Sequence, residues 1–314
     1  MTGRDRRYRV YLYGAGEEYN RFTQVLGRYS DKIRVEAVLT TEVMPFSHID
    51  YYPCITVDEA DFEIVDYVII VVERAWKEIF QTLISRGFPS NRIIRSKGFF
   101  NPNFDFDEYI DLISNNVTII SNYCLGGIIC SDLGLPCLSP TKNMFCRSDH
   151  FIEFVNNLEY YLNFNIEEYS PDSTNYEYEF ASYAPMGIIN NSIIWHFNHA
   201  TSSREGVDRW NQYRKKVNFD NVAILMECHS EEDAYKLNEL SYSKKLGMYY
   251  KPLDLPNVIY CPLWNEPAIQ IRYGWNWPTF ANRFFTNKDG YISPVNWIRF
   301  LTGRDGYIRY HFQK

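Results

Sequence analysis

The chain has 314 residues, 46% of them hydrophobic, and a formal net charge of -7 at pH 7. This length suits two domains that each bury a core, and the acidic balance argues against a nucleic-acid partner, which needs a basic face for phosphates. No run approaches the ~18 apolar residues of a membrane-spanning helix, and the basic start has no apolar region behind it. We therefore expect a cytoplasmic protein, peripheral to a membrane at most, without an integral membrane segment. The oligomeric state stays open.

Residues 1–112 alternate strands and helices in the pattern of a Rossmann-like, doubly wound parallel sheet with right-handed crossovers. The run 67–72 is mostly β-branched, as is typical of a strand buried on both faces. The predicted strands are residues 9–13, 33–39, 54–55, 67–72 and 92–95, and the predicted helices are residues 17–28, 76–86 and 104–112. Asn and Pro residues at 101–103 mark the turn into the last helix, so we place the domain boundary near residue 112.

Gly14 and Gly16 follow the first predicted strand as an incomplete dinucleotide-binding fingerprint. Tyr19 stands where a third glycine would permit close helix packing. Glu17 and Glu18 place negative charge where a pyrophosphate would lie, although two glycines can still cradle an anion at a helix N-terminus. Two interpretations remain open: a cofactor site for a nucleotide or sugar nucleotide at Gly14 and Gly16, or a scaffold turn. In either case we expect no tight binding of NAD.

Polar and small residues follow another buried strand, predicted at 117–120. Asn122, Cys124 and the pair Gly126 and Gly127 come directly before a short apolar helix. A turn at the carboxyl end of a strand points backbone N–H groups and side chains into the crevice where open α/β sheets bind ligands. We expect these four residues to supply chemistry in the second domain.

The seven cysteines are an odd number and show none of the spacings of a zinc site. We therefore expect reduced thiols and no metal. Buried cysteines usually behave as small hydrophobic residues, and Cys124 is the one that we consider functional, because of the turn that contains it.

Residues 113–314 are expected to form a second, larger α/β domain. Its predicted strands are residues 141–145, 193–197, 222–226, 248–250, 258–261 and 307–312. Its predicted helices are residues 148–162, a helix capped by Ser202, residues 231–244 and a last helix between Pro294 and Gly303. Residues 163–180 lack periodicity and are expected to be a surface excursion.

His196 and His199 lie at the end of the strand predicted at 193–197 and precede a capped helix. This repeats the geometry of the turn at Cys124, so we expect both strand ends to face one crevice. Cys124, one histidine and Asn122 would then form a nucleophile, a base and an orienting group. Alternatively, the histidine deprotonates a sugar hydroxyl while Asn122 and the glycine N–H groups hold an oxyanion. Each histidine could also be a satisfied core or surface residue.

Basic residues gather at the end of the helix after Ser202, among them Arg214. They either complement the helix C-terminus or clamp a phosphate or carboxylate of the substrate. Aromatic residues alternate with amides at 264–280, a composition shared by sugar platforms and by packed tails.

Two blocks of sequence carry a resemblance to a known family. One is Ser-Asn-Tyr-Cys-Leu-Gly-Gly at 121–127, with Asp-Leu-Gly-Leu at 132–135. The other is His-Phe-Asn-His at 196–199, then Trp210 and Arg-Lys-Lys-Val-Asn-Phe-Asp-Asn at 214–221. They resemble a bacterial family of undetermined function that recurs in capsule and exopolysaccharide biosynthesis clusters. The resemblance implies a glycan-related context and no particular reaction. On its blocks we expect substrate binding at Ser121, Gly126, Gly127, Asp132, Trp210, Arg214 and Asn221.

This resemblance covers about residues 113–250. The first domain resembles the small Rossmann-like modules of sugar-modifying proteins, through residues 11–17, 67–72 and 87–94. That likeness implies a common fold without guaranteeing nucleotide binding.

These features favour a metal-independent transferase that acts on a sugar or sugar-nucleotide intermediate of surface polysaccharide biosynthesis. Acyl transfer ranks first, because the turn at Cys124 combines a thiol, oxyanion donors and possible histidine bases. Glycosyl or phosphoryl transfer competes with it. The alternative class is a non-catalytic protein that binds a sugar nucleotide or glycan and regulates assembly. The donor, a nucleotide sugar or an acyl-CoA, and the acceptor stay unidentified.

Overall fold

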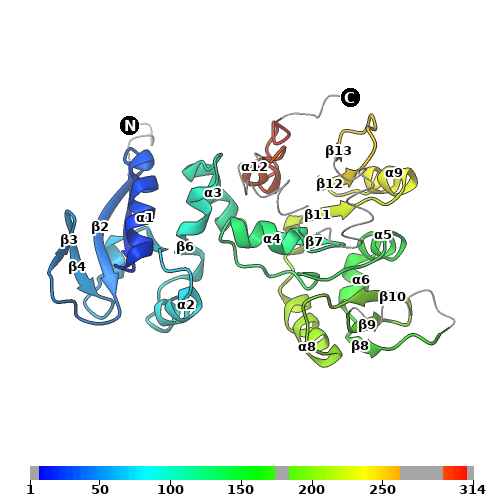
Figure 1. The fold of residues 1–314 in the computed structure, drawn as a ribbon, viewed down its shortest axis with the longest axis horizontal. Helices are drawn as coiled ribbons and strands as arrows, with labels where there is room; N and C mark the ends of the chain where they lie inside the picture. Colours follow the sequence, from blue (N-terminus) through cyan, green and yellow to red (C-terminus); the bar gives the residue numbers. More distant parts are fainter. Residues whose placement is uncertain (1–6, 174–183, 262–292, 310–314) are drawn as a thin grey trace. The chain divides into compact units, whose positions relative to one another are not determined.

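The computed structural model describes residues 7–173, 184–261 and 293–309, which form two compact units (Figure 1). The first unit comprises the described residues up to Ser114 together with Asp132–Leu135. The second comprises Asn115–Ser131 and the described residues from Pro136 onward. Both contain a parallel sheet with helices, which confirms the α/β class. In the described ranges, no helix has the length and apolarity that crossing a membrane requires.

The short segment Asp132–Leu135 differs from the expectation that everything after residue 112 belongs to the second domain. The Tyr109 hydroxyl donates a hydrogen bond of 2.5 Å to the carbonyl of Leu133, and both residues are buried. The chain therefore leaves the first unit near the predicted boundary, returns briefly and leaves again.

The first unit has a six-stranded sheet in the order β3-β4-β2-β1-β5-β6, in which only the edge pair β3 and β4 is antiparallel. This is the doubly wound arrangement expected from the alternation of strands and helices. The strands are β1 Tyr8–Tyr13, β2 Ile33–Thr40, β3 His48–Ile49, β4 Tyr52–Thr56, β5 Tyr67–Ile70 and β6 Ile93–Arg95. The helices are α1 Glu17–Leu26, α2 Trp76–Ser85 and α3 Phe106–Ser114, with 3₁₀ turns at Gly27–Tyr29, Phe62–Ile64, Ser90–Arg92 and Ser96–Phe100.

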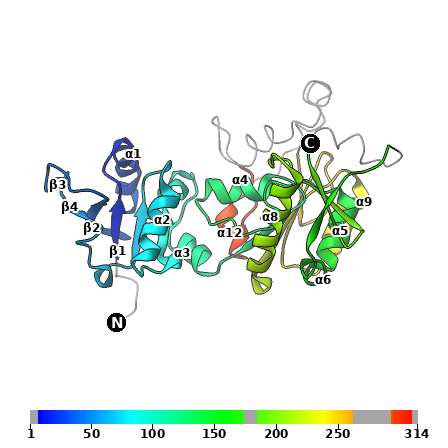
Figure 2. The same ribbon diagram turned by 90° about the horizontal axis from the view of Figure 1, so that it is seen from below.

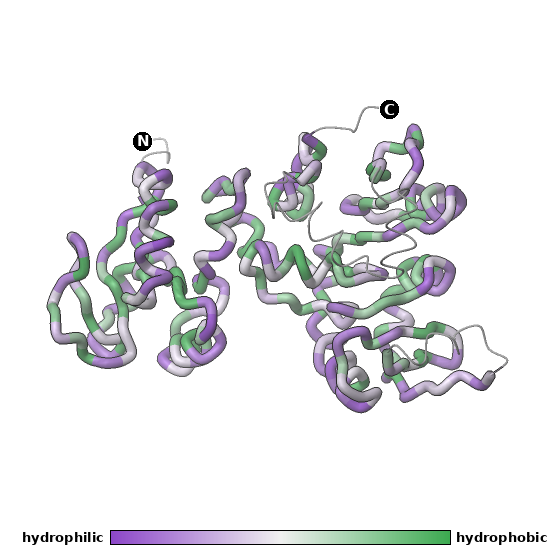
Figure 3. The backbone as a smooth tube through the Cα atoms, in the orientation of Figure 1, coloured by the Kyte–Doolittle hydropathy of each residue, from purple (hydrophilic) through white to green (hydrophobic). Residues whose placement is uncertain are grey.

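The helices of the first unit each bury one side. Tyr11 and Tyr13 of β1 belong to a core cluster with Leu83 of α2. Phe22 of α1 meets Phe99 edge to face, with ring centroids 5.1 Å apart. In Figure 3 hydrophilic and hydrophobic colours alternate along α1, as expected for a helix with one buried side.

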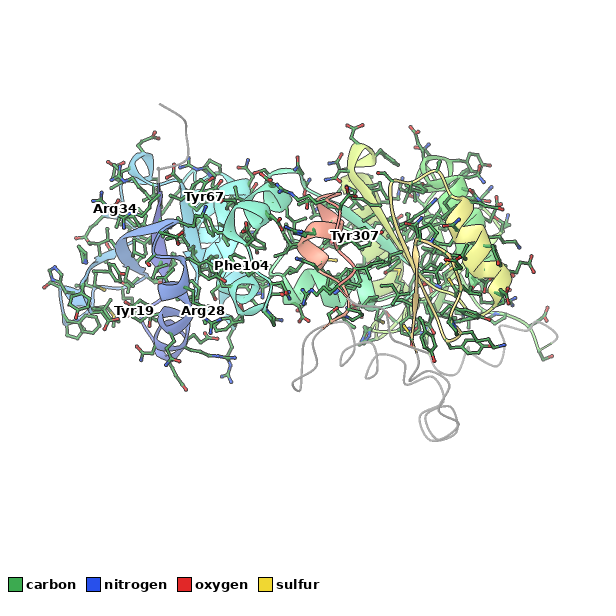
Figure 4. All side chains as sticks on the ribbon, turned by 90° about the horizontal axis from the view of Figure 1, so that it is seen from above. Tyr19, Arg28, Arg34, Tyr67, Phe104 and Tyr307 are labelled. Atoms are coloured by element: carbon green, nitrogen blue, oxygen red, sulfur yellow. The ribbon has the colours of Figure 1, made fainter. Side chains whose placement is uncertain are left out.

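Tyr19 of α1 fills the place at which a dinucleotide-binding turn would have its third glycine (Figure 4). Its side chain is fully buried, and its hydroxyl donates a hydrogen bond of 2.9 Å to the Asp50 carboxylate. This tyrosine therefore packs α1 on the sheet and holds the turn between β3 and β4.

The second unit contains a parallel sheet in the order β13-β12-β11-β7 and an antiparallel sheet in the order β10-β9-β8. The strands are β7 Thr118–Ser121, β8 Ile166–Tyr169, β9 Met186–Ile189, β10 Ile193–His196, β11 Val222–Glu227, β12 Lys244–Tyr249 and β13 Val258–Tyr260. The helices are α4 Leu125–Asp132, α5 Ser148–Asn156, α6 Leu158–Leu162, α8 Ser203–Tyr213, α9 Glu231–Glu239 and α12 Trp297–Leu301, with 3₁₀ turns at Arg214–Lys216 and Phe219–Asn221. Figure 2 shows α8, in yellow-green, beside the antiparallel sheet.

Four local predictions for the second unit were wrong. The helix predicted at 231–244 ends at Glu239, and β12 begins at Lys244. The helix predicted at 148–162 breaks at Asn157, whose amide donates to the Glu153 carbonyl and competes with the helix. Residues 141–145 are mostly a turn, because Asn143 adopts a positive φ of 57° and only Phe145 forms a β-bridge. The excursion at 163–180 contains β8, which exposes Glu167 and Glu168 and so has little hydrophobic pattern.

Candidate functional site

Two neighbouring strand ends of the second unit bring ionisable side chains together. β7 and β11 are parallel, with Ser121 opposite Leu225, so their carboxyl ends lie at the same edge of the sheet. Cys124 follows β7, and Glu227 is the last residue of β11. We call this place the β7–β11 edge, which comprises Asn122, Cys124, His199, Glu227 and His229.

Cys124 and His199 are in contact at this edge. The Cys124 Sγ lies 3.5 Å from the His199 Nε2. The cysteine is only 2% exposed, whereas the histidine is exposed. Burial raises the pKa of the Cys124 thiol to about 11; a hydrogen bond with Asn198 opposes this shift and the charge of Glu227 adds to it. Cys124 is therefore a thiol at neutral pH, with an imidazole positioned to take its proton.

A short anchored turn delivers His199 to the thiol. β10 ends at His196, and the next residue, Phe197, is only 1% exposed. The Phe197 N–H donates a hydrogen bond of 2.7 Å to the Pro185 carbonyl. Because Phe197 is held in the core, Asn198 and His199 are presented on the exposed side of the turn.

Asn122 has a different role from the predicted one. Its Nδ2 donates to the Glu227 carbonyl at 3.0 Å, and its Oδ1 accepts from the Glu227 N–H at 2.9 Å. The residue is 1% exposed. The side-chain amide thus joins the ends of β7 and β11 as a backbone ladder would, and its described hydrogen bonds include none to a histidine.

Glu227 and His229 were not predicted from the sequence. Glu227 is 5% exposed, its Oε1 lies 3.3 Å from the His229 Nε2, and its Oε2 accepts no hydrogen bond from the part of the chain that the structure describes. Burial raises the pKa of Glu227, although the hydrogen bond and charge of His229 oppose it. Burial lowers the pKa of His229, but the hydrogen bond and charge of Glu227 outweigh this effect and raise it. The pair therefore holds protons more strongly than either group would in water.

Replacing Glu227 by glutamine is expected to reduce the loss of stability at high pH. A group whose pKa is raised by folding contributes stability below its unfolded pKa, about 4.3 for glutamate, and loses it as the pH rises through the folded value. Both Glu227 and His229 shift upward, so the wild type loses stability as the pH rises from about 4. Glutamine removes the buried charge and keeps an acceptor for His229. Thermal unfolding between pH 4 and 8 measures the difference.

The control for this experiment is Glu239→Gln, at the exposed end of α9. It should leave the pH dependence of the melting temperature unchanged. A parallel pH profile for Glu227→Gln and the wild type would show that Glu227 has an ordinary pKa.

Two of the predicted residues lie in the core. His196 is 2% exposed and exchanges both backbone hydrogen bonds with Phe145, whose ring centroid is 5.2 Å from the imidazole. Among the described contacts only His199, and not His196, meets Cys124. Trp210 is fully buried, with its ring centroid 5.8 Å from that of Trp195. Trp210 therefore packs the second unit and does not present a surface to a substrate.

Ser121, Gly126 and Gly127 shape the turn around Cys124. The Ser121 hydroxyl donates to the Tyr123 carbonyl at 2.6 Å. Both glycines are buried in the first turn of α4, and a Cβ on Gly127 would overlap the Asn143 side chain. The N–H groups of a first helical turn have no partner within the helix, so they remain the candidates for oxyanion donors.

Arg214 and Asn221 support the fold. The Arg214 guanidinium donates to the Leu162 carbonyl at 2.7 Å and to the Asn165 Oδ1 at 2.8 Å. Asn221 precedes β11 and donates to the Asn115 carbonyl at 2.7 Å. It therefore lies at the amino edge of the parallel sheet, opposite the β7–β11 edge.

The remaining predicted residues belong to the first unit. The Asp132 carboxylate lies 3.6 Å from the Lys97 ammonium, so Asp132 anchors the returning segment. Gly14 has a φ of 122°, and a Cβ there would overlap the Val72 side chain. Gly16 is the N-cap of α1 and has open space around it. Close packing accounts for Gly14, while nucleotide binding at this turn stays a prediction. The aromatic region 264–280 lies outside the described residues.

Comparison with known proteins gives a distant relative and a family. An uncharacterized protein of Haemophilus influenzae is 25% identical over 181 residues, which are 55% of this chain and 83% of the relative. The structure of aspartate semialdehyde dehydrogenase II from Vibrio cholerae, complexed with ASA, is 10% identical and covers 80% of this chain and 84% of its own. Its TM-score of 0.26 supports no conclusion. Residues 6–94 match a domain described as C2185-like, N-terminal. Residues 95–302 match the Domain of unknown function (DUF1919), and the chain belongs to this family.

Proposed function

We propose that the second unit is an acyltransferase that uses Cys124 as its nucleophile and His199 as its general base. The observation that carries the proposal is the contact of 3.5 Å between the Cys124 Sγ and the His199 Nε2. This distance lets a proton pass directly from sulfur to nitrogen.

The raised pKa of Cys124 determines when that proton moves. A thiol with a pKa of about 11 is not ionised at rest, so His199 takes the proton while the sulfur attacks the carbonyl of a thioester donor. The donor's sulfur leaves and takes this proton from His199. In the second half, an acceptor hydroxyl attacks the new thioester, His199 removes the hydroxyl proton and returns it to the Cys124 sulfur. First-turn N–H groups of α4 would stabilise the oxyanion of each step.

Glu227 and His229 are assigned to the acceptor in this proposal. The buried Glu227 carboxyl has one oxygen on His229 and a second oxygen that accepts no hydrogen bond from the described residues. This oxygen is itself buried, so Glu227 acts through His229, whose imidazole is exposed and can bind a sugar hydroxyl.

The substrate class is proposed from the sequence resemblance. A hydroxyl of a sugar or sugar nucleotide in capsule or exopolysaccharide assembly is the acceptor, and an acyl-CoA is the donor. We place the reaction in the cytoplasm, where acyl-CoA is made and where thiols stay reduced; all seven cysteines of this chain are free. The first unit would serve as a scaffold or as a nucleotide-binding accessory.

The test is to trap the acyl-enzyme. The protein is incubated with a panel of acyl-CoA donors, quenched with acid and measured by intact mass spectrometry. We expect one acyl adduct that maps to Cys124 by peptide analysis and that hydroxylamine removes. Cys124→Ser should lack this thioester, and Cys54→Ser, a partly exposed cysteine of the first unit, should retain it. An adduct elsewhere, or none with any donor, would contradict the proposal.

A non-catalytic binding protein is the second candidate. It is favoured by the burial of Cys124 and by the two hydrogen bonds through which the Asn122 amide holds β11. Calorimetric titration with sugar nucleotides separates the two candidates. Binding of equal affinity in the wild type and in Cys124→Ala, without any acyl adduct, would favour the binding protein.

A further inference from the structure

The Phe197 side chain is enclosed at the place where the chain passes from β10 to α8. It is 1% exposed, and it comes directly before the exposed residues Asn198 and His199. A Cβ on Gly206 of α8 would overlap the Phe197 ring, and so would a Cβ on Gly187 of β9. The ring therefore lies directly against the backbone of both glycines.

The backbone conformation does not explain these two glycines. Gly187 lies within a strand and Gly206 within a helix, and neither has a positive φ. Glycine is less favourable than alanine inside such elements, because its backbone loses more freedom on folding. Both positions therefore require glycine for space, and the side chain that comes closest to both is Phe197.

The turn that carries His199 is fixed at its first end. The Phe197 N–H donates to the Pro185 carbonyl at 2.7 Å, and the Ala200 N–H donates to the Phe197 carbonyl at 2.9 Å. The second hydrogen bond closes a four-residue turn with Asn198 and His199 at its centre. The position of the imidazole thus depends on where the Phe197 side chain holds this turn.

Glu205 holds the other end of the turn. Its carboxylate accepts from the Thr201 N–H at 2.7 Å and from the Thr201 hydroxyl at 2.8 Å. The Ser202 hydroxyl accepts from the Glu205 N–H at 3.2 Å, at the start of α8. His199 therefore lies between two fixed points of the chain, and its Nε2 is 3.5 Å from the Cys124 Sγ.

We propose that Phe197 is a positioning residue, whose ring between Gly187 and Gly206 sets the distance of the His199 imidazole from the Cys124 thiol. The inference rests on the proposed acyltransferase for its catalytic consequence, and it adds what determines the contact of nucleophile and base. Direct proton transfer needs hydrogen-bond reach, and a displacement of about 1 Å can lower a rate by about 100-fold. A change at Phe197 should therefore act on the rate through His199.

The first measurement concerns the contact itself and requires no acyl transfer. Imidazole resonances of the full chain are recorded by NMR, and those of His199 are identified by their loss in His199→Ala. Cys124→Ala should shift the His199 resonances of the otherwise wild-type chain. Made together with Phe197→Leu or with Gly206→Ala, the same replacement should shift them far less, because the imidazole no longer lies against the sulfur.

The second measurement is the rate of acyl-enzyme formation at increasing donor concentration. Phe197→Leu and Gly206→Ala should each lower the rate at saturating donor by about 10- to 100-fold. The half-saturating donor concentration should stay unchanged, because Phe197 acts on the base and not on the donor. Phe197→Leu keeps an apolar side chain in the core, so it gives the result even where Gly206→Ala folds poorly.

Leu158→Ala is the matched control, since it removes buried volume from the core cluster that also contains Phe197. It should lower the melting temperature and preserve both the His199 shift and the acylation rate. A wild-type shift in both test variants, or an equal loss of the shift in Leu158→Ala, would overturn the proposal. A wild type that forms no acyl-enzyme would instead contradict the acyltransferase, and the NMR result would still decide the role of Phe197.

Discussion

Replacing Trp210 by alanine is expected to lower the free energy of unfolding of the second unit by about 3 to 5 kcal/mol, the usual range for a buried aromatic side chain. Trp210 is fully buried, and its ring centroid lies 5.8 Å from those of both Trp195 and Phe154. Alanine would leave a cavity between α8, α5 and β10. Urea denaturation of the wild type and the variant measures the change.

Trp210→Phe is the matched control, because phenylalanine keeps an aromatic ring in the same place. It should recover much of the lost stability. A core residue and a substrate platform at position 210 predict opposite effects of Trp210→Ala on the unfolding curve. A substrate platform would leave the unfolding curve of Trp210→Ala unchanged and weaken ligand binding, and that outcome would contradict the assignment of this residue to the core.

Replacing His199 by alanine is expected to lower the rate of acyl transfer by about 100-fold or more, the usual contribution of a general base. The melting temperature should change little, because His199 is exposed on a turn that Phe197 anchors. The rate of acyl-enzyme formation, followed by rapid quench and intact mass, measures the effect on the first half of the reaction.

His48→Ala is the control for this variant, since His48 is an exposed histidine of the first unit that lies 3.1 Å from the Ser47 hydroxyl. It should acylate at the wild-type rate. A His199→Ala variant that acylates normally over the whole pH range would remove His199 from the mechanism, even if Cys124 still carried the acyl group.

Much of the first unit could be predicted because its strands and helices have strong hydrophobic patterns. The run that became β5 and the turn at Gly14 are examples, and the expected parallel order follows from their alternation with helices. The failures came where a few polar contacts decide the backbone. Asn157 ends a helix whose apolar stripe continues through it. β8 is an edge strand with two exposed glutamates, which period-two patterns do not reveal.

The contact between Cys124 and His199 was predicted for a reason that was partly wrong. The prediction assumed that both follow strands of one parallel sheet, whereas His199 follows β10 of the antiparallel sheet. Polar residues that follow a buried parallel strand do meet at the carboxyl ends of β7 and β11. The same reasoning, applied to the strand predicted at 222–226, would have identified Glu227 as a candidate site residue.

The substrate-binding residues that were expected from the family resemblance show a second limit of prediction from sequence. The side chains of Arg214 and Asn221 can donate hydrogen bonds to a substrate or to a backbone carbonyl of the protein equally well. Their partners, Leu162 and Asn115, are 52 and 106 residues away along the chain. Residue type and spacing cannot distinguish these uses, because the fold decides which acceptor comes within reach.

The brief return of the chain to the first unit restricts how this protein can exchange modules during evolution. The match to the C2185-like, N-terminal domain ends at residue 94, but Phe99, Phe106 and Asp132–Leu135 complete the same unit and lie in the DUF1919 match. Phe99 meets Phe22, and Phe106 lies 5.3 Å from the Tyr8 ring. A recombination event at residue 94 would therefore separate aromatic residues from their partners on both sides. A different N-terminal module could replace this one only if its aromatic residues packed equally well against Phe99 and Phe106.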